Sequence, residues 1–219
     1  MASSASPTRV KICGLSTEAT LTAALEAGAD WIGLVHFPRS PRHVSLARAA
    51  TLSALARGRA ERVILLVDPD DALLAAAVEA AEPDLIQLHG SESPERVAAV
   101  RARTGRPVMK AIGVATAADL AAMPAYAAVA DRILLDAKAP ADAALPGGNG
   151  RRFDWEILRG AALPPGTMLS GGLDSGNVAD ALARTGIGAV DVSSGVETAP
   201  GLKDPAKIAA FVAAARGAR

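Results

Sequence analysis

"RVKICGLSTEATLTAALEAGADWIGLVHF" (9–37) contains a short apolar run, an Ala-rich amphipathic segment and a second short apolar run. The two runs, 9–13 and 31–37, have the length and the Val, Ile and Leu content of buried parallel strands. The segment between them, 16–29, predicts a helix that ends near Gly28. This stretch therefore predicts one β-α-β unit, in which the helix crosses back over the sheet.

The same unit recurs along the rest of the chain. Further apolar runs lie at 62–68, 84–89, 107–113, 132–137, 166–171 and 189–195. Further helical patterns lie at 45–58, 71–81, 93–104, 116–126, 154–160, 175–186 and 204–216. Eight such units close most simply as a single (β/α)8 barrel, which we expect over residues 8–219. A doubly wound open sheet is the alternative, but no G-x-G-x-x-G motif follows the first strand.

The composition limits the possible partners. Half of the 219 residues are apolar, and 23 basic residues balance 23 acidic ones, so nothing points to a nucleic acid or a membrane surface. No apolar run reaches the ~18 residues of a membrane-spanning helix. A single cysteine excludes an internal disulfide and a thiolate metal site. The opening "MASSASP" has no apolar signal region after it, so we expect a flexible tail at 1–7 and a cytoplasmic protein.

Two stretches near the C-terminus predict a phosphate site. "LSGGLDSGN" (169–177) and "VDVSSGVET" (190–198) each place small residues directly after a strand. Glycines allow an anion to approach the backbone, and N–H groups at helix starts attract it. In (β/α)8 barrels the loops after strands 7 and 8 are the usual phosphate site. Tight turns without a ligand are the alternative, but two such loops in the two expected places favour a phosphorylated ligand.

Strand periodicity places several polar side chains inside the barrel. Lys11 and Cys13 lie on the face opposite to the apolar Val10 and Ile12, so we expect both to point inward. Asp191 faces inward by the same rule, and the last strand of a closed barrel neighbours the first, so Lys11 can reach Asp191. A cation below Cys13 would also lower the pKa of its thiol. A purely structural ion pair is the alternative for Lys11.

Three further side chains are expected at the carboxyl ends of strands. Gln87 and His89 share one face of the strand at 84–89, and Asp136 ends the strand at 132–137. A thiol on strand 1 and a carboxyl on strand 6 would stand across the barrel mouth, which suits a base and an acid acting on opposite sides of one ligand. The alternative for Cys13 is a small buried apolar residue.

Two loops complete the candidate site. "HFPRSPRHV" (36–44) carries Arg42 on a proline-stiffened loop, where an arginine can bind a carboxylate through two hydrogen bonds. A solvated surface arginine is the alternative. The long loop at 137–155 contains "PGGNG" and suits a lid that excludes water, although an inserted loop without function also fits.

Seven stretches resemble, in order and spacing, the phosphoribosylanthranilate isomerase family of tryptophan biosynthesis. They are "KICG" (11–14), "GADWIGLVHFPRSPRHVS" (28–45), "QLHG" (87–90), "LLDAK" (134–138), "GGNGRRFDW" (147–155), "LSGGL" (169–173) and "VDVSSGVE" (190–197). The resemblance implies a (β/α)8 barrel that performs an Amadori rearrangement with no metal and no cofactor. It also implies a monomer, because that family is often monomeric in mesophiles.

The resemblance assigns roles to the candidate residues. It implies that Cys13 is the general base at C2′ of the ribose moiety and that Asp136 is the general acid on the furanose ring oxygen. Arg42 would bind the anthranilate carboxylate. The sugar and anthranilate region would be lined by Asp191, Gln87 and His89, and the phosphate would be held by Gly171, Gly172, Ser193, Ser194 and Gly195. It gives no role to Arg151 or Arg152.

Three other functions fit parts of the pattern. The analogous histidine-pathway aminoaldose isomerase shares barrel and reaction type, but its family has an aspartate at the position of Cys13 and its substrate needs a second phosphate site. A metal-dependent ribulose-phosphate epimerase would need His and Asp ligands at four strand ends, which three histidines do not supply. A phosphosugar-binding barrel without catalysis would have no use for Cys13 or Asp136.

Overall fold

A computed structural model describes residues 7–139, 147, 148, 150 and 152–218. Its eight parallel strands form a closed barrel in the order of the chain, with β1 hydrogen-bonded to β8. The strands are β1 (Arg9–Cys13), β2 (Trp31–Val35), β3 (Glu61–Leu66), β4 (Leu85–Leu88), β5 (Val108–Val114), β6 (Arg132–Ala137), β7 (Met168–Leu169) and β8 (Ala189–Val192). The predicted (β/α)8 barrel is confirmed, and the open sheet is excluded.

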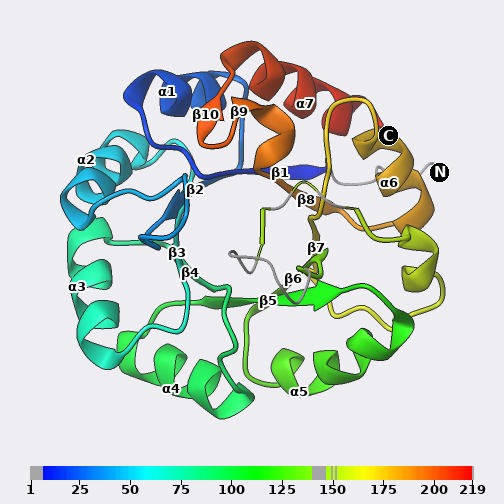
Figure 1. The fold of residues 1–219 in the computed structure, drawn as a ribbon, viewed down its shortest axis with the longest axis horizontal. Coiled ribbons are helices and arrows are strands. Elements are labelled where there is room, and N and C mark those ends of the chain that lie inside the picture. The colour runs from blue at the N-terminus through cyan, green and yellow to red at the C-terminus, as the bar shows by residue number, and fades with distance from the viewer. Residues whose placement is uncertain (1–6, 140–146, 149, 151, 219) are drawn as a thin grey trace.

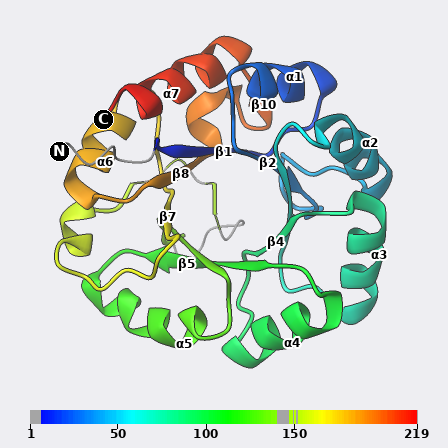
Figure 2. The ribbon, with the colours of Figure 1, turned by 180° about the vertical axis from the view of Figure 1, so that it is seen from behind.

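Helices surround the barrel on all sides (Figures 1 and 2). They are α1 (Glu18–Glu26), α2 (Leu46–Ala56), α3 (Asp71–Ala81), α4 (Pro94–Thr104), α5 (Met123–Ala127), α6 (Val178–Thr185) and α7 (Pro205–Gly217). α4 shows how the sequence sets their ends. Ser93 accepts a hydrogen bond from the Arg96 N–H, Pro94 occupies the first turn, and Gly105 ends the helix with a φ of +61°.

Two of the expected helices are shorter or tighter than predicted. The segment 116–126 forms a 3₁₀ helix, η1 (Ala117–Ala122), followed by the short α5, because Pro124 has no N–H to continue the preceding turn and fits only a first turn. The segment 154–160 forms only a 3₁₀ turn, η2 (Trp155–Leu158), since Gly160 follows at a φ of +73°. The strand predicted at 166–171 is reduced to the two residues of β7.

The strand faces separate two apolar cores, as the period-2 pattern predicts. Inside the barrel lie Trp31, Val63, Leu85, Met109, Ala111, Leu134, Met168 and Ala189. A larger core, which includes Val10 and Ile12, fills the space between the strands and the helices. The two inward residues of β1, Lys11 and Cys13, are almost completely buried, with exposed fractions of 0% and 4%.

The amino-terminal end of the barrel is closed by side chains. The Arg9 guanidinium lies 3.7 Å from the centre of the Trp31 ring, and Arg132 lies 5.2 Å from it. Glu61 accepts hydrogen bonds from Trp31 Nε1 and from Arg9, both at 2.7 Å. The Trp31 ring and the charged side chains around it therefore fill this opening, so we expect an active site at the carboxyl ends of the strands.

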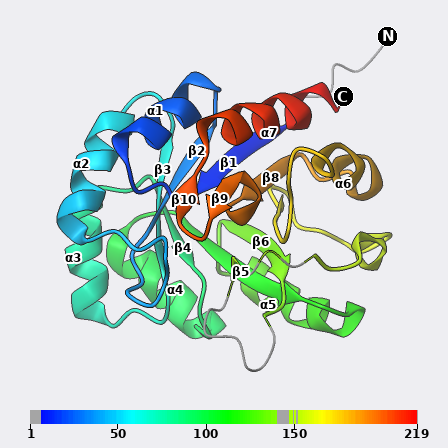
Figure 3. The ribbon, with the colours of Figure 1, turned by 45° about the horizontal axis from the view of Figure 1, so that its top comes forward.

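A short hairpin follows the last barrel strand. Beyond β8 the chain forms the 3₁₀ turn η3 (Ser194–Val196) and the antiparallel strands β9 (Glu197–Ala199) and β10 (Leu202–Lys203). Figure 3 shows this hairpin beside α7. Within the described part of the chain, no helix is long and apolar enough to cross a membrane. The tail expected at 1–7 lies, apart from the exposed Pro7, outside the described residues.

Candidate active site

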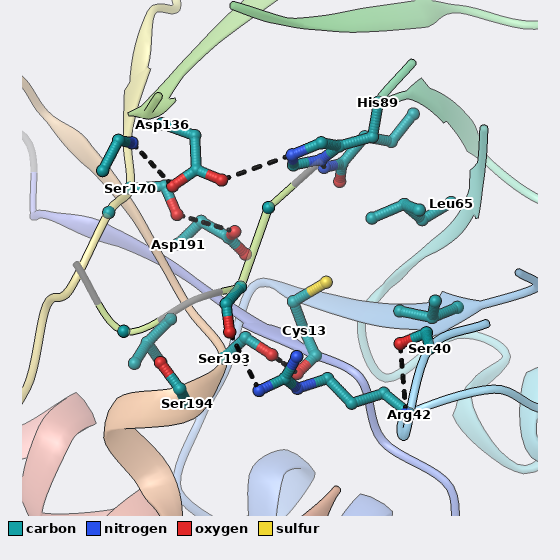
Figure 4. Close-up of a pocket in the computed structure, with 18 of the residues that line it drawn as sticks. Cys13, Ser40, Arg42, Leu65, His89, Asp136, Ser170, Asp191, Ser193 and Ser194 are labelled. Atoms are coloured by element: carbon teal, nitrogen blue, oxygen red, sulfur yellow. Dashed lines mark hydrogen bonds and ion pairs between the residues drawn. The ribbon is translucent and has the colours of Figure 1, made fainter. Parts of the chain in front are cut away.

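The carboxyl ends of the strands surround a cavity of about 760 Å³, a volume that includes its open mouth. Its lining contains ten of the eleven predicted site residues: Cys13, Arg42, Gln87, His89, Asp136, Gly171, Gly172, Asp191, Ser193 and Ser194. Figure 4 shows how the labelled members converge on one space. Gly195 is absent from this lining because it packs against the backbone of Leu173 and Asp174. The cavity thus brings together residues from β1, β4, β6 and β8 and from the loops after β2, β4, β7 and β8.

Lys11 and Asp191 form a buried ion pair in which Asp191 also lines the cavity. Their strands are in register, and Lys11 Nζ lies 2.8 Å from Asp191 Oδ1. The second carboxylate oxygen of Asp191 accepts a hydrogen bond from Ser170 Oγ at 3.2 Å. The pairing expected from strand alternation is confirmed, and it holds the Asp191 carboxylate against the inward side chain of β1.

The Cys13 thiol lies in the cavity wall with Val35 and Leu65. Burial raises its pKa, and the neighbouring Lys11 cation lowers it by a smaller amount, while Asp191 adds to the rise. The expectation that Lys11 would leave Cys13 with a lowered pKa is therefore wrong. The reason is that the sequence shows the cation but not the extent to which the thiol loses its solvent.

Gln87, His89 and Asp136 form a chain of polar contacts. Gln87 Nε2 lies 2.9 Å from His89 Nδ1, and His89 Nε2 lies 3.3 Å from Asp136 Oδ2. An amide nitrogen can only donate, so Nδ1 accepts and the imidazole proton sits on Nε2, facing Asp136. The other Asp136 oxygen accepts the Ala137 N–H at 2.9 Å. Gln87 therefore fixes the tautomer of His89, and His89 orients the Asp136 carboxyl.

Arg42 is buried and held by a carboxylate that the sequence analysis did not identify. Its Nε and one terminal nitrogen donate to the two oxygens of Glu197 at 2.7 and 2.8 Å. Arg42 has an exposed fraction of 5%, so the solvated-arginine alternative is wrong. Burial alone would raise the pKa of Glu197, but hydrogen bonds from Arg42 and the charge of Lys203 lower it overall. The remaining nitrogen, Nη1, lies beside Gly148 and donates to no described residue, and both Arg42 and Gly148 line the cavity.

At the site, Lys203 is a second buried charge, after Glu197, that the sequence did not reveal. Its ammonium donates to Glu197 Oε1 at 2.6 Å and to the carbonyl and hydroxyl oxygens of Ser193 at 3.0 and 3.1 Å. The only available signal was a lysine shortly after the "SSGVE" stretch, and a strand of two residues has no periodicity that shows which way a side chain points.

The loops after β7 and β8 have backbone suited to an anion. Gly171 and Gly172 have φ values of +88° and +64°, and their N–H groups donate no hydrogen bond to a described residue. A Cβ on Gly171 would lie 2.6 Å from the Ala137 nitrogen, so only glycine fits. The Ser193 hydroxyl is already engaged, since it donates to the Cys13 carbonyl oxygen and accepts from Lys203. Any phosphate contact of Ser193 therefore falls to its backbone.

Residues 140–146, 149 and 151 of the loop after β6 lie outside the described residues, and with them the middle of the predicted lid at 137–155. Three of its described glycines, Gly147, Gly148 and Gly150, line the cavity. Gly147 lies against His89 and Asp136, and Gly148 accepts a 3.3 Å hydrogen bond from Arg42. Arg152 is exposed, and Arg151 is among the residues that the structure does not describe. Among the described residues, no group of three or more His, Cys, Asp and Glu side chains is arranged to hold a metal ion.

Comparisons with known proteins give one consistent result. The family model described as "N-(5'phosphoribosyl)anthranilate (PRA) isomerase" matches residues 10–214. N-(5'-phosphoribosyl)anthranilate isomerases of Azorhizobium caulinodans and of Rhodopseudomonas palustris strain BisA53 are similar to the chain. The first is 68% identical over 95% of this chain and 92% of its own. The second is 61% identical over 96% of both chains.

Solved structures agree. The phosphoribosyl anthranilate isomerase of Thermotoga maritima superposes with a TM-score of 0.86 at 34% identity, over 96% of this chain and 99% of its own. An isomerase in complex with reduced 1-(o-carboxyphenylamino)-1-deoxyribulose 5-phosphate gives 0.83 at 32% identity, with the same coverage. With 205 of 219 residues inside the family match and the predicted site assembled in one cavity, the chain belongs to the N-(5'-phosphoribosyl)anthranilate isomerase family.

Proposed function

We propose that this isomerase of tryptophan biosynthesis converts phosphoribosylanthranilate into 1-(2-carboxyphenylamino)-1-deoxyribulose 5-phosphate with Cys13 as general base and Asp136 as general acid. The observation that carries the proposal is their position: they come from β1 and β6 and point into the same cavity (Figure 4). The family match and the shared name of the relatives favour this reaction over an epimerase, a binding-only barrel and the histidine-pathway isomerase.

The reaction proceeds through two proton transfers. Asp136 gives a proton to the furanose ring oxygen, the bond between this oxygen and C1′ breaks, and the anthranilate nitrogen forms an iminium with C1′. Cys13 then takes the proton from C2′, and the electron pair of that C–H bond forms the enolamine, which tautomerises to the ketone. Each proton transfer typically contributes about 10²–10⁴-fold, so the groups that hold both ends of the substrate must contribute the rest.

Charge supports a base that is activated only when substrate is bound. Burial raises the pKa of the Cys13 thiol, because the thiolate would lose its solvation there. The iminium that forms on the substrate brings a positive charge close to this thiol and joins Lys11 in favouring the thiolate. The thiol therefore ionises where an acceptor for the C2′ proton is needed.

The acid is supported by the chain of contacts behind it. His89 directs its Nε2 proton towards Asp136 Oδ2 and is itself fixed by Gln87. This chain holds the Asp136 carboxyl towards the cavity and places a proton donor within reach of it after it has protonated the ring oxygen. His89 and Gln87 are therefore proposed to line the substrate region and to keep the acid in position.

The two ends of the substrate have separate partners. Arg42 offers its Nη1 to the anthranilate carboxylate, because Nε and Nη2 already donate to Glu197. The unengaged N–H groups of Gly171 and Gly172 are proposed to hold the phosphate, together with the backbone of residues 193–195. A substrate held in this way at both ends spans the cavity, with its reacting carbons between Cys13 and Asp136.

The test is to replace each reacting group separately. Cys13→Ser and Asp136→Asn should each lower kcat by about 10²-fold or more, while both variants still bind the reduced product analogue. Asp180→Asn, a matched change on the exposed face of α6 where Asp180 pairs with Arg184, should leave turnover unchanged. Near-normal turnover in either site variant would show that the assignment is wrong. Growth rescue of a tryptophan auxotroph lacking this isomerase tests the activity in a cell.

We propose that the enzyme acts as a monomer in the cytoplasm, where amino-acid biosynthesis takes place. Among the described residues, the large exposed apolar side chains are Leu55 and Leu202, and they belong to separate elements. They offer no contiguous apolar surface for an obligate partner. Sedimentation equilibrium gives the mass directly, and a dimer at micromolar concentration would contradict the proposal. A Thermotoga maritima relative is described as dimeric.

A further inference from the structure

Lys203 is a buried ammonium whose three donors all meet site residues. Its side chain is 1% exposed, and its partners are the Glu197 carboxylate and two oxygens of Ser193. The Ser193 hydroxyl accepts from Lys203 because its own proton goes to the Cys13 carbonyl oxygen. Three acceptors around one nitrogen require the NH₃⁺ form. Lys203 does not itself line the cavity, and its hydrogen bonds connect it to the lining at Ser193.

The network joins the two ends of the proposed substrate site. Glu197 receives Arg42 on both of its oxygens and Lys203 on one of them. Ser193 begins the loop proposed to hold the phosphate, and Arg42 is proposed to hold the carboxylate. Lys203 therefore lies between the two groups that fix the length of the substrate that fits.

The charges in this network do not cancel. Arg42 and Lys203 are both cations and share the single carboxylate of Glu197, all three almost completely buried. Burial lowers the pKa of Lys203, Glu197 raises it, and the Arg42 cation lowers it further. Burying a second cation beside the same carboxylate costs free energy that this one carboxylate does not fully offset. The excess positive charge is complementary to a substrate that carries a phosphate and a carboxylate.

We propose that Lys203 is a positioning residue for substrate binding. Its ammonium holds the phosphate loop at Ser193 and the Arg42–Glu197 pair at a fixed separation. It also supplies the net positive charge that the two anionic groups of the substrate neutralise. The inference rests on the proposed function, in which Arg42 and the loops after β7 and β8 hold these groups. It adds a residue of the β9–β10 hairpin that touches no reacting atom.

Replacing Lys203 by Met separates this role from a structural one. The variant leaves Arg42 and Glu197 as a balanced pair, and Ser193 keeps its contacts to Cys13 and to the Val196 N–H. We therefore expect Lys203→Met to fold, with a Tm change of less than about 4 °C. We expect KM for phosphoribosylanthranilate, and the Kd of the reduced product analogue, to rise by about 30-fold or more. The value of kcat at saturation should change far less, because the acid and base are untouched.

Lys207→Met is the matched control. Lys207 also contacts Glu197, but it is exposed and donates to the backbone carbonyl at 2.7 Å, so its removal leaves the carboxylate network intact. The control should keep wild-type KM and Kd. Unchanged KM and Kd in Lys203→Met would overturn the proposal. Loss of the folded state in that variant would also overturn it, because it would make the ammonium a structural requirement.

A further variant distinguishes this inference from the function beneath it. Arg42→Met tests the carboxylate partner directly and should raise KM whether or not Lys203 has a role. If Arg42→Met has no effect, the proposed substrate site is wrong. If Arg42→Met weakens binding and Lys203→Met does not, the site is correct and only the role of Lys203 is refuted.

Discussion

Replacing Lys11 by Met removes the cation from the ion pair inside the barrel. Lys11 is fully buried and Asp191 is 5% exposed, so neither group can turn to solvent. In the variant, Asp191 keeps the Ser170 hydroxyl at 3.2 Å as its partner among the described side chains. One hydrogen bond from a neutral hydroxyl does not compensate a carboxylate at that depth.

The structure gives the size of the effect. Two unit charges 2.8 Å apart attract each other by about 6 kcal/mol at an effective dielectric constant of ~20. Part of this offsets the cost of burying both ions, and removing one partner of such a pair costs about 3–5 kcal/mol in the free energy of unfolding. For a chain of this length that loss corresponds to a fall in Tm of about 6–20 °C.

Urea and thermal denaturation of three variants test this reasoning. Lys11→Met should show the full loss, and Lys11→Met/Asp191→Asn should recover much of it, because no isolated charge remains. Arg57→Met removes a cation from an equally short, 2.7 Å ion pair with Glu82 on the surface, and should cost less than about 1 kcal/mol. If Lys11→Met were no less stable than Arg57→Met, the pair would not hold the barrel interior together in the way described.

Three further outcomes are expected. Because burial raises the pKa of Cys13, less thiolate is present at pH 7 than in free cysteine. Alkylation of Cys13 by iodoacetamide, followed by mass spectrometry, should therefore be slow at pH 7 and accelerate towards higher pH. A fast rate that does not depend on pH would contradict this. In Gly171→Ala the new Cβ would lie 2.6 Å from the Ala137 nitrogen at a φ of +88°, so binding of inorganic phosphate should weaken by about tenfold or more. In the control Gly58→Ala, at a φ of +75°, the new Cβ has no atom within 4 Å, and phosphate binding should not change. Turnover should survive exhaustive chelation, since the proposed acid and base need no Lewis acid; a loss that a divalent ion restores would point to metal-dependent chemistry.

Strand alternation accounts for what the sequence could reveal about the site. In a barrel with apolar residues on both faces of each strand, Lys11 and Asp191 stand out as charged residues on the inward side. Counting the units then placed Cys13 and Asp136 at the same end of the barrel. Both inferences depend only on local periodicity and on the order of the strands, and the structure confirms this placement.

Strand alternation could not identify Glu197 as the partner of Arg42. Glu197 is 155 residues away from Arg42, and it lies on a strand of three residues in a hairpin that is not part of the barrel. No periodic pattern extends into so short an element. The raised pKa of Cys13 was missed for a different reason, because the sequence shows which charges are near but not how much solvent the fold removes.

The Lys11–Asp191 pair also bears on how the chain is made. Its two residues are separated by 180 positions, and they join the first strand of the barrel to the last. Until residue 191 has left the ribosome, Lys11 has no counter-ion and the edge of β1 that pairs with β8 is open. An open edge invites pairing with other chains, and contacts of such long sequence separation form late in folding. Ring closure by the final βα unit is therefore the step that protects a nascent chain, and shortened products that end before β8 should aggregate rather than persist as partial barrels.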